Sequence, residues 1–246
     1  IAVMEALAQE LGLTAPPAPW HVARDGFAET VAWLGLLCGS LAKMATDVIL
    51  LGQTEIGELT EPYEEGRGGS STMPQKRNPI ASEYILAAAR SVQALVPLMQ
   101  GAMAHDHERA TGPWQAECVA VPQAFVLAHG ALEHTERVAG GMQIDAERML
   151  RNTRMDGGLL MAEAVMMALA PRTGRAAAHH LVEEVCKRAV SERIDLAEAL
   201  RRTPETRTHL DDAAIDRVTD PSCYLGSAGA FIDRVLAQAR PLLTSG

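Results

Sequence analysis

A regular spacing of apolar residues over residues 26–57 constrains the fold of this 246-residue chain more than any other feature. Apolar side chains recur there in alternating steps of three and four, which places them on one face of a long α-helix. A face that stays in register over several heptads is typical of helices packed side by side at a shallow angle. The positions are Val31, Leu34, Cys38, Leu41, Ala45 and Val48.

The composition predicts an all-α protein. Apolar residues make up 48% of the chain, yet aromatic residues only 4%, and this balance favours helices over sheets. Two further long helices are expected over 80–104, where Pro97 should cause a kink, and over 115–139. Shorter helices are expected over 145–153, 158–169, 173–191, 195–202, 211–218 and 226–240.

Proline and glycine residues mark the boundaries of these elements. The proline-rich stretch 14–20 excludes a helix, and Asp25 is a candidate cap for the helix that follows. Gly140 and Gly141 are expected to end the third long helix. We therefore predict a long-helix bundle over 1–141 and a smaller all-helical domain over 142–246. The first eleven residues resemble the end of a helix that begins upstream, so we expect a longer parent protein.

Charge and composition argue against several classes of protein. The net charge of −9 and the lack of a long basic run argue against nucleic-acid binding. We find no apolar run of membrane-spanning length and no signal peptide, so we expect a cytoplasmic protein that does not bind a membrane. The four cysteines form no CxxC pair and are expected to be reduced thiols rather than zinc ligands.

The segment 61–79 differs from the rest of the chain because it is rich in glycine, hydroxyl and charged residues. It is expected to form a mobile loop ahead of the helix that Pro79 opens. A helix N-terminus attracts anions, and Lys76 and Arg77 would add to that field. The loop could thus close over a carboxylate substrate, although composition alone favours an ordinary solvated surface loop.

The string GGSSTMPQKRNP at 68–79 resembles the signature GSSxMPxKxNP of the fumarase/aspartase superfamily. The resemblance implies that Ser70 is the catalytic acid/base on the substrate carbon. It also implies that Lys76 and Asn78 bind a substrate carboxylate. Glu83 occupies the place of the acidic residue that partners the catalytic histidine, which would lie upstream of this chain.

Members of this superfamily make or break a bond at a carbon β to a carboxylate, through an enolate-like dianion. A serine hydroxyl is a weak base in water, so it needs nearby cations and loop amides to stabilise its charged form. Ser71 and Thr72, beside the catalytic candidate, and Arg109 are further candidates for substrate binding.

Other segments are similar to the carboxymuconate cycloisomerase branch of the superfamily. That branch adds a carboxylate oxygen across a neighbouring C=C bond to close a lactone, and Ser70 would carry the proton. The reaction belongs to aromatic degradation and needs no metal or nicotinamide. The matching segments are Pro19-Trp20-His21, Gln53-Thr54-Glu55, His107-Glu108-Arg109, Trp114-Gln115-Ala116-Glu117, Met161-Ala162-Glu163 and Tyr224-Leu225-Gly226-Ser227-Ala228.

Two alternatives remain open from the sequence. Adenylosuccinate lyases follow their Glu-Arg segment with a serine and a second arginine that bind a phosphate. Residues 110–118 contain no second arginine, which argues against a nucleotide substrate. Cys118 stands where the cycloisomerases are expected to have tryptophan. The second alternative is a truncated, non-catalytic relative that only associates with partners.

The resemblance also implies a homotetramer in which each active site combines residues of three subunits around a small polycarboxylate. The run His105-Asp106-His107-Glu108 looks like a metal cluster, but neighbours two apart on a helix do not face one site. Arg109, Trp114 and Glu117 could line the active site, although packing and ion pairing explain them nearly as well. His179 and His180 are expected at a surface or an interface.

Overall fold

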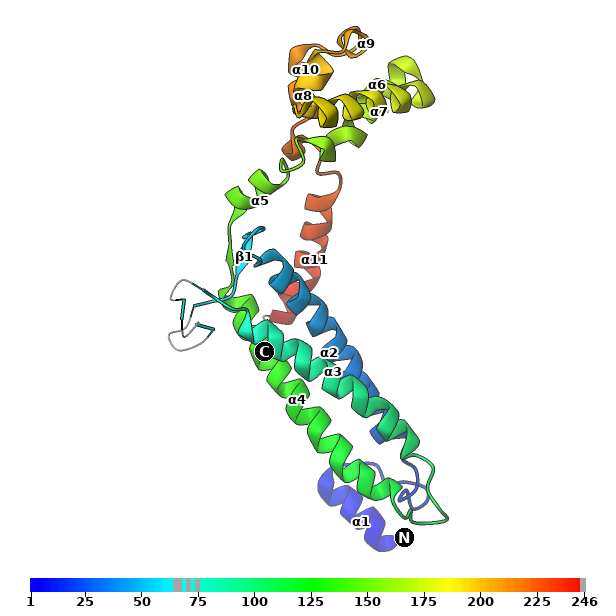
Figure 1. Ribbon diagram of the computed structural model, residues 1–246. Helices are drawn as coiled ribbons and strands as arrows, with labels where there is room; N and C mark the ends of the chain where they lie inside the picture. Colours follow the sequence, from blue (N-terminus) through cyan, green and yellow to red (C-terminus); the bar gives the residue numbers. More distant parts are fainter. Residues whose placement is uncertain (64–67, 70–71, 74–75, 244–246) are drawn as a thin grey trace. The chain divides into compact units, whose positions relative to one another are not determined.

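The computed structural model describes residues 1–63, 68–69, 72–73 and 76–243, and its chain divides into two compact units, Ile1–Asp145 and Ala146–Gly246 (Figure 1). Apart from two strands of two residues each, every regular element of the described residues is a helix, which confirms the predicted all-α class. The division falls later than the expected boundary at 141. The reason is that the short strand after that point pairs with a strand of the first unit.

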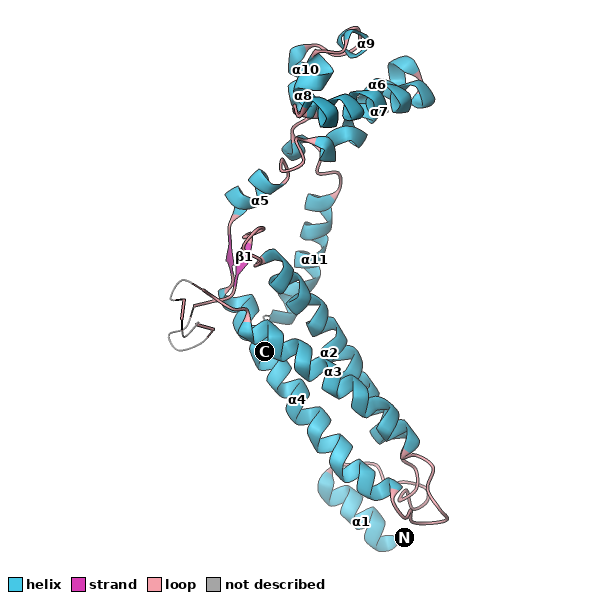
Figure 2. Ribbon diagram, viewed as in Figure 1, coloured by secondary structure: helices cyan, strands magenta, loops and turns pink. Residues whose placement is uncertain are grey.

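The first unit is built on three long helices that follow the short α1 (Ala2–Leu11). Helix α3 packs along both of the others (Figure 2). The predicted long helices are thereby confirmed, but the first of them ends earlier than expected, at a cap on Gly52. Arg24 rather than Asp25 is its N-cap, so the predicted aspartate cap is wrong and Asp25 lies in the first turn. The three helices are α2 (Asp25–Leu51), α3 (Ile80–Gly101) and α4 (Pro113–Gly141).

The core of this bundle is a narrow seam of mostly small side chains. Helix α4 contributes only alanines to the seam, and these let the helices approach closely. Helix α2 is long and apolar enough to cross a membrane by length and composition, which the sequence analysis did not find. Core helices of soluble proteins pass the same test. In α2, one face packs against α3 and α4, and 28% of the most apolar window is buried within this chain. The buried seam comprises Ala28, Val31, Leu34, Cys38, Ala89, Val92, Met99, Ala102, Ala120, Ala124 and Ala128.

A two-stranded antiparallel ladder joins the end of the bundle to the chain beyond it. Strand β1 (Leu59–Thr60) pairs with β2 (Gln143–Ile144), with Leu59 opposite Ile144. Leu59 is buried against Val48 and Val138, so the ladder rests on a small apolar cluster of α2 and α4. The sequence analysis missed both strands because two-residue strands carry no periodicity.

The second unit has a compact core of larger side chains, including Leu169, Leu196, Leu200 and Ile215, all fully buried. Its predicted helices are confirmed with shifts of a few residues at their ends, while α9 and η2 were not predicted. Pro171 lies inside the last turn of α6 rather than beyond it. The elements are α5 (Ala146–Asn152), η1 (Leu159–Met161), α6 (Ala162–Thr173), α7 (Arg175–Glu192), α8 (Leu196–Arg201), α9 (Pro204–Arg207), α10 (Asp212–Val218), η2 (Pro221–Cys223) and α11 (Ala228–Leu243).

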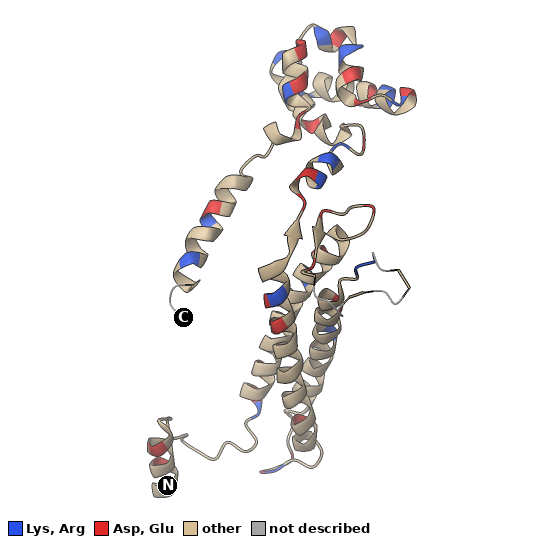
Figure 3. Ribbon diagram, turned by 90° about the vertical axis from the view of Figure 1, so that its left-hand side faces the viewer, with Lys and Arg blue, Asp and Glu red and all other residues tan. Residues whose placement is uncertain are grey.

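Charge is distributed unevenly between the two units. Figure 3 shows long uncharged stretches on α2, α3, α4 and α11, whereas acidic and basic residues lie close together on the other helices of the second unit. Residues 146–246 contain as many basic as acidic side chains, so the net charge of −9 belongs entirely to the first unit.

Candidate functional site

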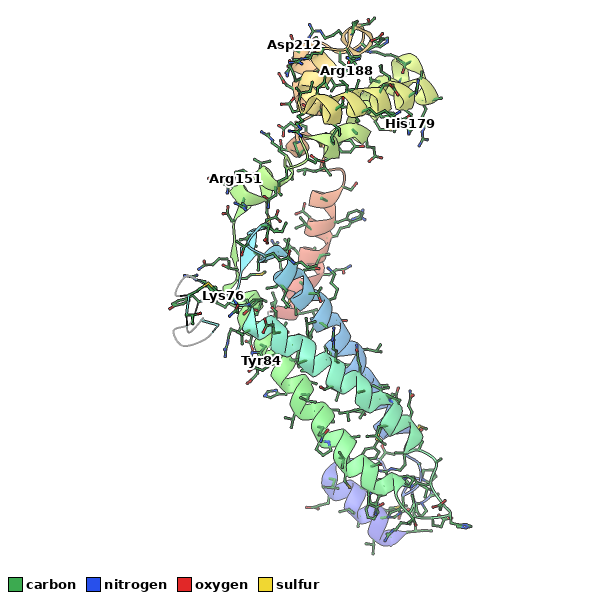
Figure 4. All side chains as sticks on the ribbon, in the orientation of Figure 1. Lys76, Tyr84, Arg151, His179, Arg188 and Asp212 are labelled. Carbon is green, nitrogen blue, oxygen red and sulfur yellow. The ribbon has the colours of Figure 1, made fainter. Side chains whose placement is uncertain are left out.

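Three of the predicted site residues lie at one end of the bundle. Lys76 and Glu83 are exposed and Asn78 is half-buried, and all three lie at or just before the start of α3. Figure 4 labels Lys76 in the segment before α3 and Tyr84 in the first turns of α3. The bundle thus brings the proposed carboxylate ligands together with the proposed partner of the catalytic histidine.

The remaining candidates divide into two groups. Thr72 is exposed in the same segment, whereas Ser70 and Ser71 lie outside the described residues. Arg109 follows the far end of α3. A helix rises about 1.5 Å per residue, so the 22 residues of α3 separate its two ends by about 33 Å. Within one chain, Arg109 therefore cannot act on a ligand held by Lys76.

Protein acceptors occupy the backbone N–H groups at the N-terminus of α3. The carboxylate of Glu61 accepts hydrogen bonds from the N–H of Ala81 at 3.1 Å and of Ser82 at 2.8 Å. The N–H of Ile80 donates to the Asn78 carbonyl, and that of Glu83 donates to the Pro79 carbonyl. Glu61 therefore occupies two of the donors at the helix end that the sequence analysis proposed for a substrate anion, and that anion-binding role stays a prediction.

The segment that carries Lys76 and Asn78 is closed at its base by backbone contacts. The Asn78 N–H donates to the Gly68 carbonyl at 2.9 Å, and Gly69 and Arg77 form an antiparallel bridge. Gly68 has φ +68°, and a Cβ there would lie 2.8 Å from the Asn78 carbonyl oxygen. Glycine is therefore required at this position both by conformation and by space.

A cavity of about 480 Å³ lies beside this base. Arg77, Arg137 and His134 bring cationic or protonatable groups to its wall, and Asn78 adds an amide. Among the described residues that line the cavity, Glu61 has the one carboxylate, and it accepts hydrogen bonds from the start of α3. The polar part of the wall therefore favours an anion, and carboxylates fit that description.

Helix α4 completes this end of the bundle. The ring of His134 stacks on Tyr84 of α3, with centroids 5.6 Å apart and planes 12° apart. Gly141 at the end of α4 lies against Pro62, because a Cβ on Gly141 would approach Pro62 Cβ to 2.8 Å. The sequence analysis missed Glu61 and His134, since nothing local in the sequence links them to the segment 68–79.

The opposite end of the bundle is held by a buried ion pair. Arg24 and Glu117, which are 6% and 7% exposed, form a two-pronged contact, and Arg24 Nε donates to Glu117 Oε2 at 2.8 Å. The Arg24 guanidinium also lies 4.1 Å from the ring centre of Phe27. Arg109 lies over the Trp114 ring at 5.4 Å. Glu117 thus has the ion-pairing role that the sequence analysis weighed against an active-site role.

The described residues contain no group of three or more histidine, cysteine, aspartate and glutamate side chains that could hold a metal ion. The run 105–108 lies between α3 and α4 and is not helical, and His107 in it has a left-handed backbone with φ +46°. Both ring nitrogens of His105 are buried without a hydrogen-bond partner.

Two family models match this chain. The model described as "Lyase" matches residues 1–94, and the model described as "Adenylosuccinate lyase C-terminus" matches residues 158–235. The first match contains the segment 68–79, and the second lies within the second unit.

Curated relatives match nearly the whole chain. The 3-carboxy-cis,cis-muconate cycloisomerase of Pseudomonas aeruginosa is 47% identical, and the match covers 98% of this chain and 52% of that protein. Trans-aconitate decarboxylase 1 of Mycosarcoma maydis is 42% identical, with coverage of 97% and 48%. The crystal structure of the 3-carboxy-cis,cis-muconate lactonizing enzyme from Pseudomonas putida has a TM-score of 0.89 and 42% identity, with coverage of 97% and 52%. This chain therefore spans about half the length of the relatives it matches.

Proposed function

Because this chain belongs to the fumarase/aspartase lyase superfamily, we propose that it is part of a 3-carboxy-cis,cis-muconate cycloisomerase, an intramolecular lyase of the cytoplasm. The observation that carries the proposal is the segment 68–79. It has the sequence of the superfamily signature, and its residues Arg77 and Asn78, which directly follow Lys76, line a cavity whose wall also carries Arg137.

In this proposal, Lys76 and Asn78 hold one carboxylate of a tricarboxylate substrate. A second carboxylate oxygen adds across the neighbouring C=C bond and closes the lactone ring. The adjacent carbon becomes enolate-like, and Lys76 stabilises the negative charge that develops on its carboxylate. Ser70 delivers the proton to that carbon, and Glu83 orients the catalytic histidine expected upstream.

We also propose that the functional protein is a homotetramer with shared active sites. Apolar side chains are exposed on the long helices, including Trp33 at 59%, Leu36 at 74% and Val126 at 70%. Such side chains gain from burial against another copy. Antiparallel association would also bring the Arg109 end of one bundle to the Lys76 end of another.

The competing functions differ in what the substrate carries. A nucleotide substrate requires a cationic pocket for its phosphate, and the segment after Arg109 contains no second arginine. A decarboxylase would release carbon dioxide from a smaller tricarboxylate such as trans-aconitate. These differences make the substrate the most direct discriminator.

The test uses the entire polypeptide that the gene encodes, incubated separately with 3-carboxy-cis,cis-muconate, trans-aconitate and adenylosuccinate. The expected result is that the ultraviolet absorbance of the muconate falls with the parent protein and stays constant with the Ser70→Ala variant. Turnover of another substrate instead would assign the chain to a different branch. No turnover of any of the three would favour a non-catalytic relative.

Replacement of Lys76 by Met should lower kcat/KM for the muconate by about 100-fold or more, because a preorganised charge at the developing anion is lost. Lys187→Met is the matched control, since Lys187 is an exposed lysine of the second unit that pairs with Glu183. Equal activity of the two variants would contradict the proposed role of Lys76 in substrate binding.

A further inference from the structure

Glu61 connects the chain after β1 to the start of α3. Its carboxylate contacts Ala81, 20 residues further along the sequence, and Ser82, 21 residues further along. Its carboxylate accepts three hydrogen bonds from the first turn of α3. Two come from the backbone of Ala81 and Ser82, and the third comes from Ser82 Oγ at 2.6 Å. Ser82 is fully buried and Glu61 is half-buried, so water has little access to this contact.

This contact replaces the cap that α3 does not have locally. The N-cap position is Pro79, and the helix has no side-chain cap from that residue. A proline side chain offers no acceptor, so the exposed N–H groups need a partner from elsewhere. The Glu61 carboxylate supplies it, and the positive end of the helix dipole favours the charge.

The contact lies at the base of the segment that carries the signature residues. Glu61 directly follows β1, and Ser82 directly follows the start of α3. Next to it, the Asn78–Gly68 hydrogen bond and the Arg77 guanidinium over the Tyr63 ring, at 4.7 Å, hold the two sides together. Glu61 thereby fixes where the exit of the segment meets the helix that carries Glu83.

We propose that Glu61 is a positioning residue for the proposed reaction: it holds the start of α3 so that Lys76 and Asn78 keep their place relative to Glu83. The inference rests on the proposed function.

The test compares Glu61→Ala, Glu61→Gln and Ser82→Ala with Glu136→Gln, an exposed glutamate of α4 that serves as the control. A small misplacement of catalytic groups costs up to about 100-fold, so kcat for the muconate should fall by about 10-fold to 100-fold in Glu61→Ala with a smaller change in KM. Added formate or acetate should restore part of the kcat of Glu61→Ala, because a free carboxylate can occupy the vacated helix end. The control should keep the parent kinetics and show no response to formate.

Hydrogen exchange of peptides spanning residues 76–86 provides a readout that does not depend on turnover. Faster exchange there in the Glu61 and Ser82 variants, with unchanged exchange in the second unit, is the expected result. Unchanged kcat and unchanged exchange would overturn the proposal. Faster exchange with unchanged kcat would reduce Glu61 to a purely structural cap. If the parent protein itself turns over no muconate, the proposed function fails, while the exchange data still decide whether Glu61 holds the segment.

Discussion

The two units of this chain bury their apolar residues in opposite ways. The first unit packs long helices along a seam of mostly small side chains, and both units leave large apolar residues exposed, on α2 in the first and on α11 in the second. The second unit folds short helices around a cluster of leucine, valine and isoleucine. Alanine buries less apolar area than leucine, valine or isoleucine, and it forms a larger share of the first seam than of the second cluster.

The contrast indicates different sources of stability. Ion pairs join neighbouring helices of the second unit, as Arg201 does with Asp212 and Asp216, and its core closes on itself. The first unit contains the candidate site and has fewer charges along its helices. We expect the core formed by α6, α7, α8 and α10 to be stable by itself, and the exposed apolar faces of the long helices and of α11 to gain stability from association with other copies.

The largest expected change in stability is the loss of stability of the first unit in Glu117→Gln. The change leaves the buried Arg24 guanidinium without its charged partner, and removing one partner of a buried pair costs about 3–5 kcal/mol. All three tryptophans lie in the first unit, so the urea transition followed by tryptophan fluorescence should move to a lower concentration. The double replacement Arg24→Met with Glu117→Leu should recover most of the loss. A fluorescence midpoint unchanged in Glu117→Gln would contradict the role of the pair.

A comparable but slightly smaller effect is expected from Leu200→Ala in the second unit. Leu200 is fully buried, and truncation of a buried leucine costs about 2–5 kcal/mol. The circular dichroism transition should shift while the tryptophan transition stays in place, since the second unit contains no tryptophan. Leu160→Ala, at a residue that is 60% exposed, is the control. A shift of both signals together would show that the two units unfold as one.

The smallest effect concerns the reactivity of the thiols. Cys118 and Cys223 are exposed, one in each unit, and should react first with a thiol reagent. Burial raises the pKa of Cys38 and of Cys186, so less of the reactive thiolate is present at a given pH. Their labelling should therefore be slow near neutral pH and accelerate only at higher pH than for the exposed thiols. Labelling of all four at one rate, measured by mass spectrometry, would contradict the burial of both cores.

Features of this molecule could be predicted from the sequence where the interacting residues are close together in the chain. The helices were predictable because the apolar spacing around Val31 and Leu34 is local. The segment of Lys76 and Asn78 was also visible, since its residues are consecutive. The pairing of Leu59 with Ile144 and the capping of Ser82 by Glu61 were not predictable, because they join residues far apart in the chain. The sequence also did not show that α3 separates Arg109 from Lys76, because that separation depends on the length of the folded helix.

The ladder between β1 and β2 gives this part of the chain a further property. Paired Cα atoms in an antiparallel ladder lie about 5 Å apart, so the chain returns at residue 144 to the place it left at residue 59. Adjacent ends of this kind are the geometry that tolerates circular permutation and the insertion of whole modules. The signature segment and the two helices after it therefore leave and rejoin the chain at one place, while their side chains share the buried seam with α2, so an exchanged cassette must keep that seam. Evolution or an engineer could exchange that cassette between relatives while leaving the path of α2 intact.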